Sequence, residues 1–204
     1  MTHAIDTIEQ LEALFGEAGE ASLKKEVPWL HPSYQALIAA SPFAVLATTG
    51  PGGLDASPRG DPPGFVAVQD EKTLLLPERR GNHRIDSLRN IVADPRVALL
   101  FLIPGVSETL RINGRARIIV NEELAASFAI NERVPKILLE VTADRVYFQC
   151  AKALVRSRLW ASESQVPRSA LPSTGQILEQ ITNKAIDAAE HDRGYPERVK
   201  QTIY

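Results

Sequence analysis

Short apolar runs separated by turn formers dominate the middle of the chain. The runs combine apolar or β-branched residues and end at Gly or Pro breaks; they cover residues 43–49, 54–59, 65–68, 74–76 and 97–103. Runs of this length between breakers predict strands rather than helices. The first four follow one another without room for crossover helices, so they indicate an antiparallel meander or barrel and not a parallel sheet.

A strict alternation marks the later part of the predicted sheet. Apolar and small residues between 109 and 120 alternate with a basic row, Arg111, Asn113, Arg115 and Arg117, which predicts a half-buried strand. Residues 137–141 and 145–148 predict two further strand pieces linked around 142–144. The β core therefore spans about Phe43 to Cys150.

Helical spacing flanks this core and interrupts it twice. The predicted helices cover 8–15, 32–38, 85–92, 122–128, 151–160 and 177–186, the last ending before Gly194 and Pro196. Residues 24–30 and 162–174 are expected to be connectors. We expect one domain, mainly β with flanking helices: N-terminal helices packing on the barrel in 1–42, the core in 43–160, and a linker and helix in 161–204.

Composition narrows the class of protein. The chain of 204 residues is 44% hydrophobic, has a formal net charge of -2 and contains one cysteine, Cys150. This balance gives no reason to expect a nucleic-acid partner, and a single cysteine suits a reducing compartment. The acidic amino end does not resemble an export signal, and the most apolar run, 97–103, falls far short of the roughly 20 residues of a membrane span. We expect a soluble, cytoplasmic protein that binds no membrane.

Standard catalytic motifs are not found. His3, His31, His83 and His191 are scattered without the spacing of a zinc site, and no serine elbow, dinucleotide fingerprint or phosphate-loop motif occurs. We expect no metal, and we expect Cys150 to act as a small buried residue. No catalytic residue can be assigned.

Two polar segments remain as candidate chemistry. Arg79, Arg80 and Arg84 precede the helix predicted at 85–92, and Ser57 and Arg59 belong to the segment SPRGD. Guanidinium groups and the N–H groups of a helix start can bind an anion together, and Arg suits a phosphate because it donates two parallel hydrogen bonds. A solvated turn followed by a capped helix fits the same residues.

The order of these segments resembles the pyridoxamine phosphate oxidase superfamily of FMN-binding split barrels, in the branch of probable FMN-dependent enzymes of unknown substrate. The resemblance covers about 43–160 and is strongest in SPRGD, in the segment NHRIDSLRNI with DPRVALLF after it, and in KALVRSRLW. It implies an antiparallel split β-barrel that binds FMN at a homodimer interface.

The resemblance also implies roles for individual residues. Arg59 and Arg84 would hold the phosphate, with Ser57, Asn82 and Ser87 as neutral partners, whereas Arg79 and Arg80 would be exposed bystanders. Gly60, Asp61, Leu76 and Pro77 would lie beside the ribityl chain and the ring. Three later residues would reach the partner subunit's flavin: Lys152, Arg156 and Trp160.

Two departures from the family pattern argue against vitamin B6 oxidation while leaving flavin binding intact. Ile85 follows Arg84 where the oxidases carry a lysine, and the ending HDRGYPERVKQTIY lacks their substrate-binding pattern. We therefore expect a dimeric FMN-dependent oxidoreductase that acts on an unidentified small molecule. The alternatives are a split-barrel protein that holds flavin or haem without turnover, and a regulatory or structural dimer that binds an anion.

Overall fold

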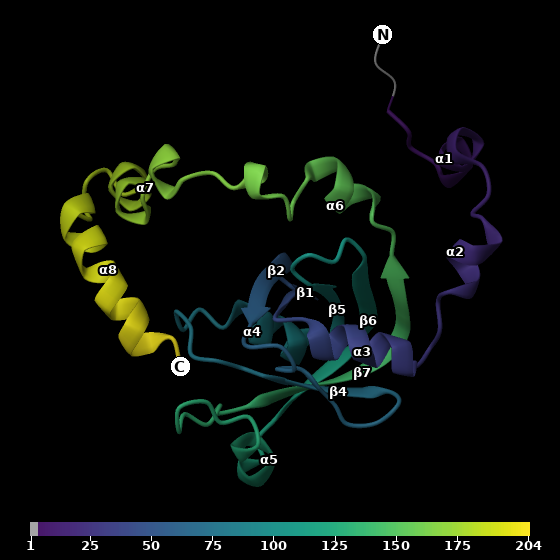
Figure 1. Ribbon diagram of the computed structural model, residues 1–204, viewed down its shortest axis with the longest axis horizontal. Coiled ribbons are helices and arrows are strands. Elements are labelled where there is room, and N and C mark those ends of the chain that lie inside the picture. Colours follow the sequence, from purple (N-terminus) through teal and green to yellow (C-terminus); the bar gives the residue numbers. More distant parts are fainter. Residues whose placement is uncertain (1–3) are drawn as a thin grey trace.

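The computed structural model describes residues 4–204, so His3 lies outside the described part. Its centre is one seven-stranded sheet with the order β2-β1-β5-β6-β7-β4-β3 (Figure 1). The strands are β1 (Phe43–Gly50), β2 (Gly53–Gly60), β3 (Ala67–Val68), β4 (Thr73–Pro77), β5 (Arg96–Leu102), β6 (Thr109–Ile119) and β7 (Leu138–Gln149). Every neighbouring pair is antiparallel, as the short apolar runs predict.

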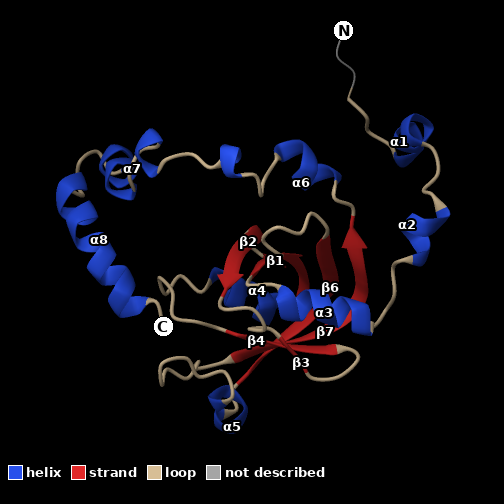
Figure 2. Cartoon of the chain, in the orientation of Figure 1, coloured by secondary structure: helices blue, strands red, loops and turns tan. Residues whose placement is uncertain are grey.

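The sheet is strongly bent but does not close, since β2 and β3 both remain at its edges. The long strands β6 and β7 connect its two halves: one part of β6 pairs with β5, and one part of β7 pairs with β4. The expected mainly β architecture with flanking helices is confirmed (Figure 2).

The core lies inside this bend. Leu46, Leu74, Leu99 and Val141 are fully buried there, each contributed by a different strand. Two helices complete it, α3 (Pro32–Ala40) through the fully buried Ile38 and α4 (Asp86–Ala93) through Ile91. Burial of apolar side chains from every layer is the main stabilising contribution to such a core.

The strand pieces predicted at 137–141 and 145–148 form one continuous strand, β7. The polar residues between them mark a β-bulge: Asn113 pairs with Arg145 and Gly114 with Ala143, which leaves Asp144 as the extra residue. Gly114 is required there because a Cβ would clash with the carbonyl oxygen of Thr142. The interruption of the apolar pattern at residues 142–144 therefore marks a bend in β7 and not the end of a strand.

The remaining helices are α1 (Ile8–Phe15), α2 (Glu20–Lys24), α5 (Glu122–Ala126), α6 (Lys152–Ser157), α7 (Thr174–Ile181) and α8 (Ala188–Thr202). Helix α1 buries none of its residues. Helices α6 to α8 form an arm that leaves the sheet after β7 and curves back, so that the C-terminal end lies near the sheet (Figure 1). We call residues 152–204 the C-terminal arm.

The prediction that the last helix ends before Gly194 was wrong. Helix α8 runs through both Gly194 and Pro196. Proline inside a helix removes one backbone hydrogen bond and crowds the carbonyl four residues earlier. Contacts to a neighbouring helix stabilise α8 nevertheless: Asp192 accepts hydrogen bonds from the Ser173 hydroxyl and from the Gly175 N–H of α7.

Candidate functional site

The predicted phosphate residues come together in one cavity of about 330 Å³. Its polar wall includes five of the predicted residues, Ser57, Arg59, Asn82, Arg84 and Ser87. They come from β2, from the turn after β4 and from the first turn of α4. The period of two along β2 turns Asp55, Ser57 and Arg59 to the same side of the strand.

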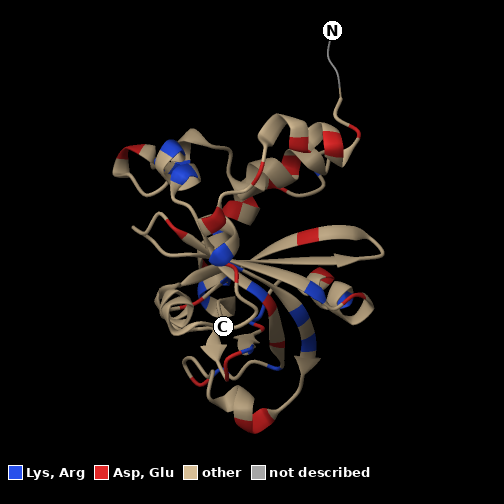
Figure 3. Cartoon of the chain, turned by 90° about the vertical axis from the view of Figure 1, so that its right-hand side faces the viewer, with Lys and Arg blue, Asp and Glu red and all other residues tan. Residues whose placement is uncertain are grey.

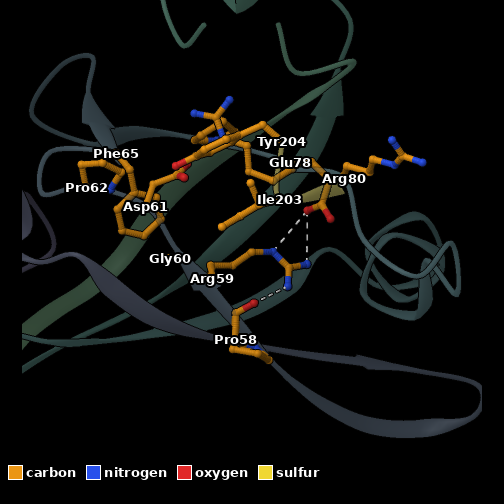
Figure 4. A pocket seen from close by; sticks show the side chains of 12 residues that line it. Pro58, Arg59, Gly60, Asp61, Pro62, Phe65, Glu78, Arg80, Ile203 and Tyr204 are labelled. Carbon is orange, nitrogen blue, oxygen red and sulfur yellow. Dashed lines mark hydrogen bonds and ion pairs between the residues drawn. The ribbon is translucent and has the colours of Figure 1, made fainter. Parts of the chain in front are cut away.

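A second cavity of about 440 Å³ adjoins the first, because Pro58, Arg59 and Glu78 line both. Gly60, Asp61 and Pro77 line it as well. Phe65 and Tyr204 also border it, and Figure 4 shows Phe65 beside Asp61. We call the two adjoining cavities the groove. Eight of the residues predicted around a flavin ring and phosphate thus border the groove directly: Ser57, Arg59, Gly60, Asp61, Pro77, Asn82, Arg84 and Ser87.

Arg59 stands at the junction of the two cavities. Its Nε and Nη2 each lie 3.2 Å from Oε2 of Glu78, and its Nη1 donates to Ser57 Oγ at 2.6 Å and to the Pro58 carbonyl at 3.0 Å. The side chains of Arg59 and Glu78 are only 13% and 22% exposed. Their mutual contact fixes the guanidinium so that it faces both cavities.

Glu78 was not predicted as a site residue from the sequence. Burial has the largest effect on the pKa of its carboxyl. Desolvation raises the pKa of its carboxyl above the ordinary value, and the opposing effect of Arg59 does not cancel this rise. Glu78 therefore takes up a proton more readily than an exposed glutamate does.

Two other polar residues of the first cavity, Arg84 and Ser87, also pair with carboxylates. Arg84 Nε donates to Asp86 at 2.8 Å, and the Ser87 hydroxyl, which is 5% exposed, donates to Asp55 at 2.6 Å. Asn82 accepts from the Arg84 backbone N–H at 3.1 Å. An anion that binds Arg84 has to replace the carboxylate of Asp86. Because the Arg84 side chain is 74% exposed, its ion pair with Asp86 is weak and easily broken.

The expectation that Arg79 is an exposed bystander was wrong. Its side chain is 16% exposed, and its Nε donates to Oδ2 of the nearly buried Asp61 at 2.6 Å. Its Nη1 donates to the Phe128 carbonyl at 2.8 Å, and its guanidinium lies 5.7 Å from the centre of the Tyr204 ring. Arg80 is exposed, as expected.

Tyr204 was also missed, and it brings the end of the C-terminal arm into the groove. Burial and the neighbouring Asp61 carboxylate raise the pKa of its phenol. No local pattern around residue 204 predicts this contact, since Asp61 and Arg79 lie more than a hundred positions earlier in the chain.

Four predicted residues line neither cavity of the groove. Leu76 is fully buried in the core, and Lys152 and Arg156 are exposed on α6. Trp160 donates its Nε1–H to the Val106 carbonyl at 2.8 Å, which ties the C-terminal arm to the turn after β5. Cys150 lies just beyond the last residue of β7 and is exposed. The expectation that it is buried was therefore wrong.

Charges of both signs are interspersed over the molecule (Figure 3). Within residues 4–204, no group of three or more His, Cys, Asp or Glu side chains is arranged to hold a metal ion. The same part of the chain contains no helix that is long and apolar enough to cross a lipid bilayer.

Solved structures with a similar arrangement include HupZ of Group A Streptococcus, at 18% identity and a TM-score of 0.46 over 58% of this chain and 92% of that one. General stress protein 26 of Bacillus anthracis gives 16% identity and a TM-score of 0.44 over 56% and 88%. An FAD-binding protein of Mesorhizobium loti gives 14% identity and a TM-score of 0.42 over 57% and 92%. Curated proteins give no match.

The family assignment rests on a match over the sheet and its connections. Residues 30–150 match the family described as pyridoxamine 5'-phosphate oxidase. This range begins before α3, ends just after β7 and contains every strand of the open barrel. The chain therefore belongs to the pyridoxamine 5'-phosphate oxidase family and has its split-barrel fold.

Proposed function

We propose that the protein is an FMN-dependent oxidoreductase acting on a small molecule, with FMN bound in the groove. The observation that carries this proposal is the composition of the groove. Residues that could bind a phosphate gather in the first cavity. The second is bordered by glycine, proline and aromatic residues together with paired charged side chains such as Asp61 and Arg79. Family membership supports a flavin as the ligand.

The residues of the groove fit such a ligand in size and donor type. The volumes of about 330 and 440 Å³ fall within or near the range of about 300–1,000 Å³ of small-molecule sites. Arg84, released from Asp86, and Arg59 could donate to one phosphate, with Ser57 and Asn82 as neutral partners. The nearby backbone of Gly60 and Pro77 would border the ring.

Bound FMN would supply the redox chemistry, which explains why the chain needs no catalytic triad. The protein's residues would bind the phosphate, orient the ring and limit access of water. Glu78, with its raised pKa, would place a carboxyl that can carry a proton beside the junction of the two cavities.

We further propose that the protein is a homodimer. The open sheet leaves β2 and β3 at its edges, and α1 carries exposed apolar residues such as Leu14 and Phe15. A partner subunit would bring its Lys152, Arg156 and Trp160 to the groove. Within one chain, these side chains lie away from the groove.

Binding of FMN and riboflavin tests the proposed cofactor site. Arg84→Ala and Arg59→Ala should each weaken FMN binding about tenfold or more and change riboflavin binding little, because riboflavin lacks the phosphate and a charged hydrogen bond contributes about 1.5–3 kcal/mol. Arg89→Ala, on the exposed side of α4, is the matched control.

The measurement is a fluorescence titration of each flavin into the protein freed of its own ligand. Equal losses for FMN and riboflavin would contradict the phosphate assignments, and an absence of saturable binding to the parent protein would exclude the cofactor site. Bleaching of the bound flavin by a reduced nicotinamide would then distinguish an oxidoreductase from a protein that holds flavin without turnover.

A further inference from the structure

A third cavity, of about 680 Å³, lies next to the groove and is separate from the phosphate residues. It is bounded by residues 78–85, by α4 and by residues 132–137, which we call the 132–137 loop. Glu78, Arg79, Arg80 and Tyr204 line both this cavity and the second cavity of the groove. A molecule bound here would therefore lie against the same residues that border the proposed flavin.

The interior of the third cavity is apolar. Ile85 and Leu88 form one wall at the start of α4, and Val134, Pro135 and Ile137 form the other. Ile85 and Val134 are 48% and 49% exposed, so apolar surface faces the opening instead of packing in the core. Small-molecule sites typically combine such apolar walls with a few polar groups.

The polar groups of this cavity carry an excess of positive charge. Arg80, Arg133 and Lys136 line it and form no ion pair within residues 4–204. The other lining charges are largely compensated, because Glu78 pairs with Arg59 and Arg79 with Asp61. Glu132 is the one remaining lining carboxylate, so an acidic ligand would meet a favourable local charge.

Backbone conformation provides a separate indication that this cavity binds a ligand. Three of the seven non-glycine residues with positive φ in the described chain lie in the two segments around this cavity, His83 (63°), Ile85 (53°) and Glu132 (62°), and a fourth, Asn131 (50°), directly precedes the 132–137 loop. The left-handed region is unfavourable for such residues, above all for the β-branched Ile85. Strained residues of this kind cluster at ligand-binding segments.

We propose that the third cavity is the substrate site, and that the substrate has an apolar body and one acidic group. This inference rests on the proposed function, because the flavin would lie in the adjoining groove. The aromatic ring of Tyr204, which lies against Arg79 and lines both cavities, would form part of the boundary between substrate and flavin. Apolar walls select the body of the substrate, and the unpaired cations at the rim select its charge.

Three matched fluorinated probes test the charge preference in the full-length protein by ¹⁹F NMR. We expect 4-fluorobenzoate to bind saturably and at least about fivefold more tightly than the neutral 4-fluorobenzamide, and 4-fluorobenzylamine to bind most weakly. The triple variant Arg80→Gln with Arg133→Gln and Lys136→Gln should remove the preference for the acid over the amide while retaining amide binding.

The position of the site is tested by filling the cavity. Val134→Trp should abolish 4-fluorobenzoate binding, whereas Val166→Trp, at an exposed position of the C-terminal arm, should leave it unchanged. In FMN-loaded protein, 4-fluorobenzoate should also shift the visible absorption of the flavin, and Val134→Trp should remove that shift. Circular dichroism of both variants would verify that they are folded.

Parallel FMN titrations separate this inference from the proposed function. Two results obtained together with saturable FMN binding would overturn the substrate site alone. One is equal affinity of the protein for 4-fluorobenzoate and 4-fluorobenzamide, and the other is equal binding of 4-fluorobenzoate by the two Trp variants. Saturable acid binding without FMN binding would overturn the proposed function and the role as substrate site, and leave an acid-binding cavity. Acid binding that does not alter the spectrum of bound FMN would overturn the substrate role.

Discussion

Arg79 donates its Nε–H to the carboxylate of Asp61 at 2.6 Å and so connects the segment after β4 to the segment after β2. The Asp61 side chain is 3% exposed and that of Arg79 is 16% exposed, so neither is surrounded by water. A buried ion pair of this kind constrains geometry more than it adds stability. Here it holds two walls of the groove at a fixed separation.

Replacing one member of this pair should destabilise the fold strongly. Arg79→Met leaves Asp61 buried without its cation, and we expect a loss of about 3 kcal/mol in the free energy of unfolding. The neighbouring Arg80→Met should change it by less than about 0.5 kcal/mol, because Arg80 is exposed. Urea denaturation measures both. Similar losses for the two variants would contradict the structural role assigned to the pair.

The contrast between Arg79 and Arg80 illustrates what local sequence could and could not predict. The strands were predictable because apolar periodicity is local, and so were Ser57, Arg59 and Asn82 as groove residues, since the family pattern contains them. The partners of Arg79 lie 18 and 49 residues away, so no local pattern distinguishes it from Arg80. Glu78 and Tyr204 were missed for the same reason.

The bulge in β7 is a second feature that a local sequence pattern could not predict in full. Residues 142–144 interrupt the apolar pattern, and a turn and a bulge both produce such an interruption. Only the pairing of Asn113 with Arg145 and of Gly114 with Ala143 distinguishes them. Pairing between strands is a long-range property, so the sequence predicted the position of the irregularity but not its kind.

A methyl group at Gly114 should therefore be costly. Gly114→Ala would push a Cβ into the backbone of Thr142, and we expect about 1–3 kcal/mol of destabilisation from overpacking. Gly52→Ala is the matched control, because a Cβ there has no heavy atom within 4 Å. Thermal unfolding of the two variants provides the comparison. An unchanged midpoint for Gly114→Ala would show that the ladder at the bulge can relax.

Glu78 should make stability depend on pH in an unusual direction. Its pKa is raised in the folded state, so the unfolded chain releases this proton first as the pH rises. The contribution of Glu78 to stability is then complete below the ordinary glutamate pKa and is lost as the pH rises through the raised value. Glu78→Gln should lack this decline in denaturation curves measured across the acidic range. The exposed Glu123→Gln should retain it.

The same residue should limit the affinity for FMN. Deprotonated Glu78 places a negative charge beside the proposed phosphate position and also occupies Arg59. Glu78→Gln should therefore strengthen FMN binding severalfold at neutral pH and leave riboflavin nearly unchanged, as measured by fluorescence titration. Weaker binding of both flavins would instead indicate that the Arg59–Glu78 contact is needed to shape the groove.

The position of β2 at the edge of the sheet has a consequence for how the protein matures. Within residues 4–204, β2 has β1 as its only strand neighbour, and Pro58 in its middle has no N–H to offer. Edge strands open more readily than central ones, and a ligand that binds only the closed form suppresses such opening in proportion to its occupancy. Since β2 carries Ser57 and Arg59, loading with flavin would slow amide hydrogen exchange along this strand and protect it from proteases. If flavin binds in the groove as proposed, chains that carry it would resist proteolysis longer than chains that do not.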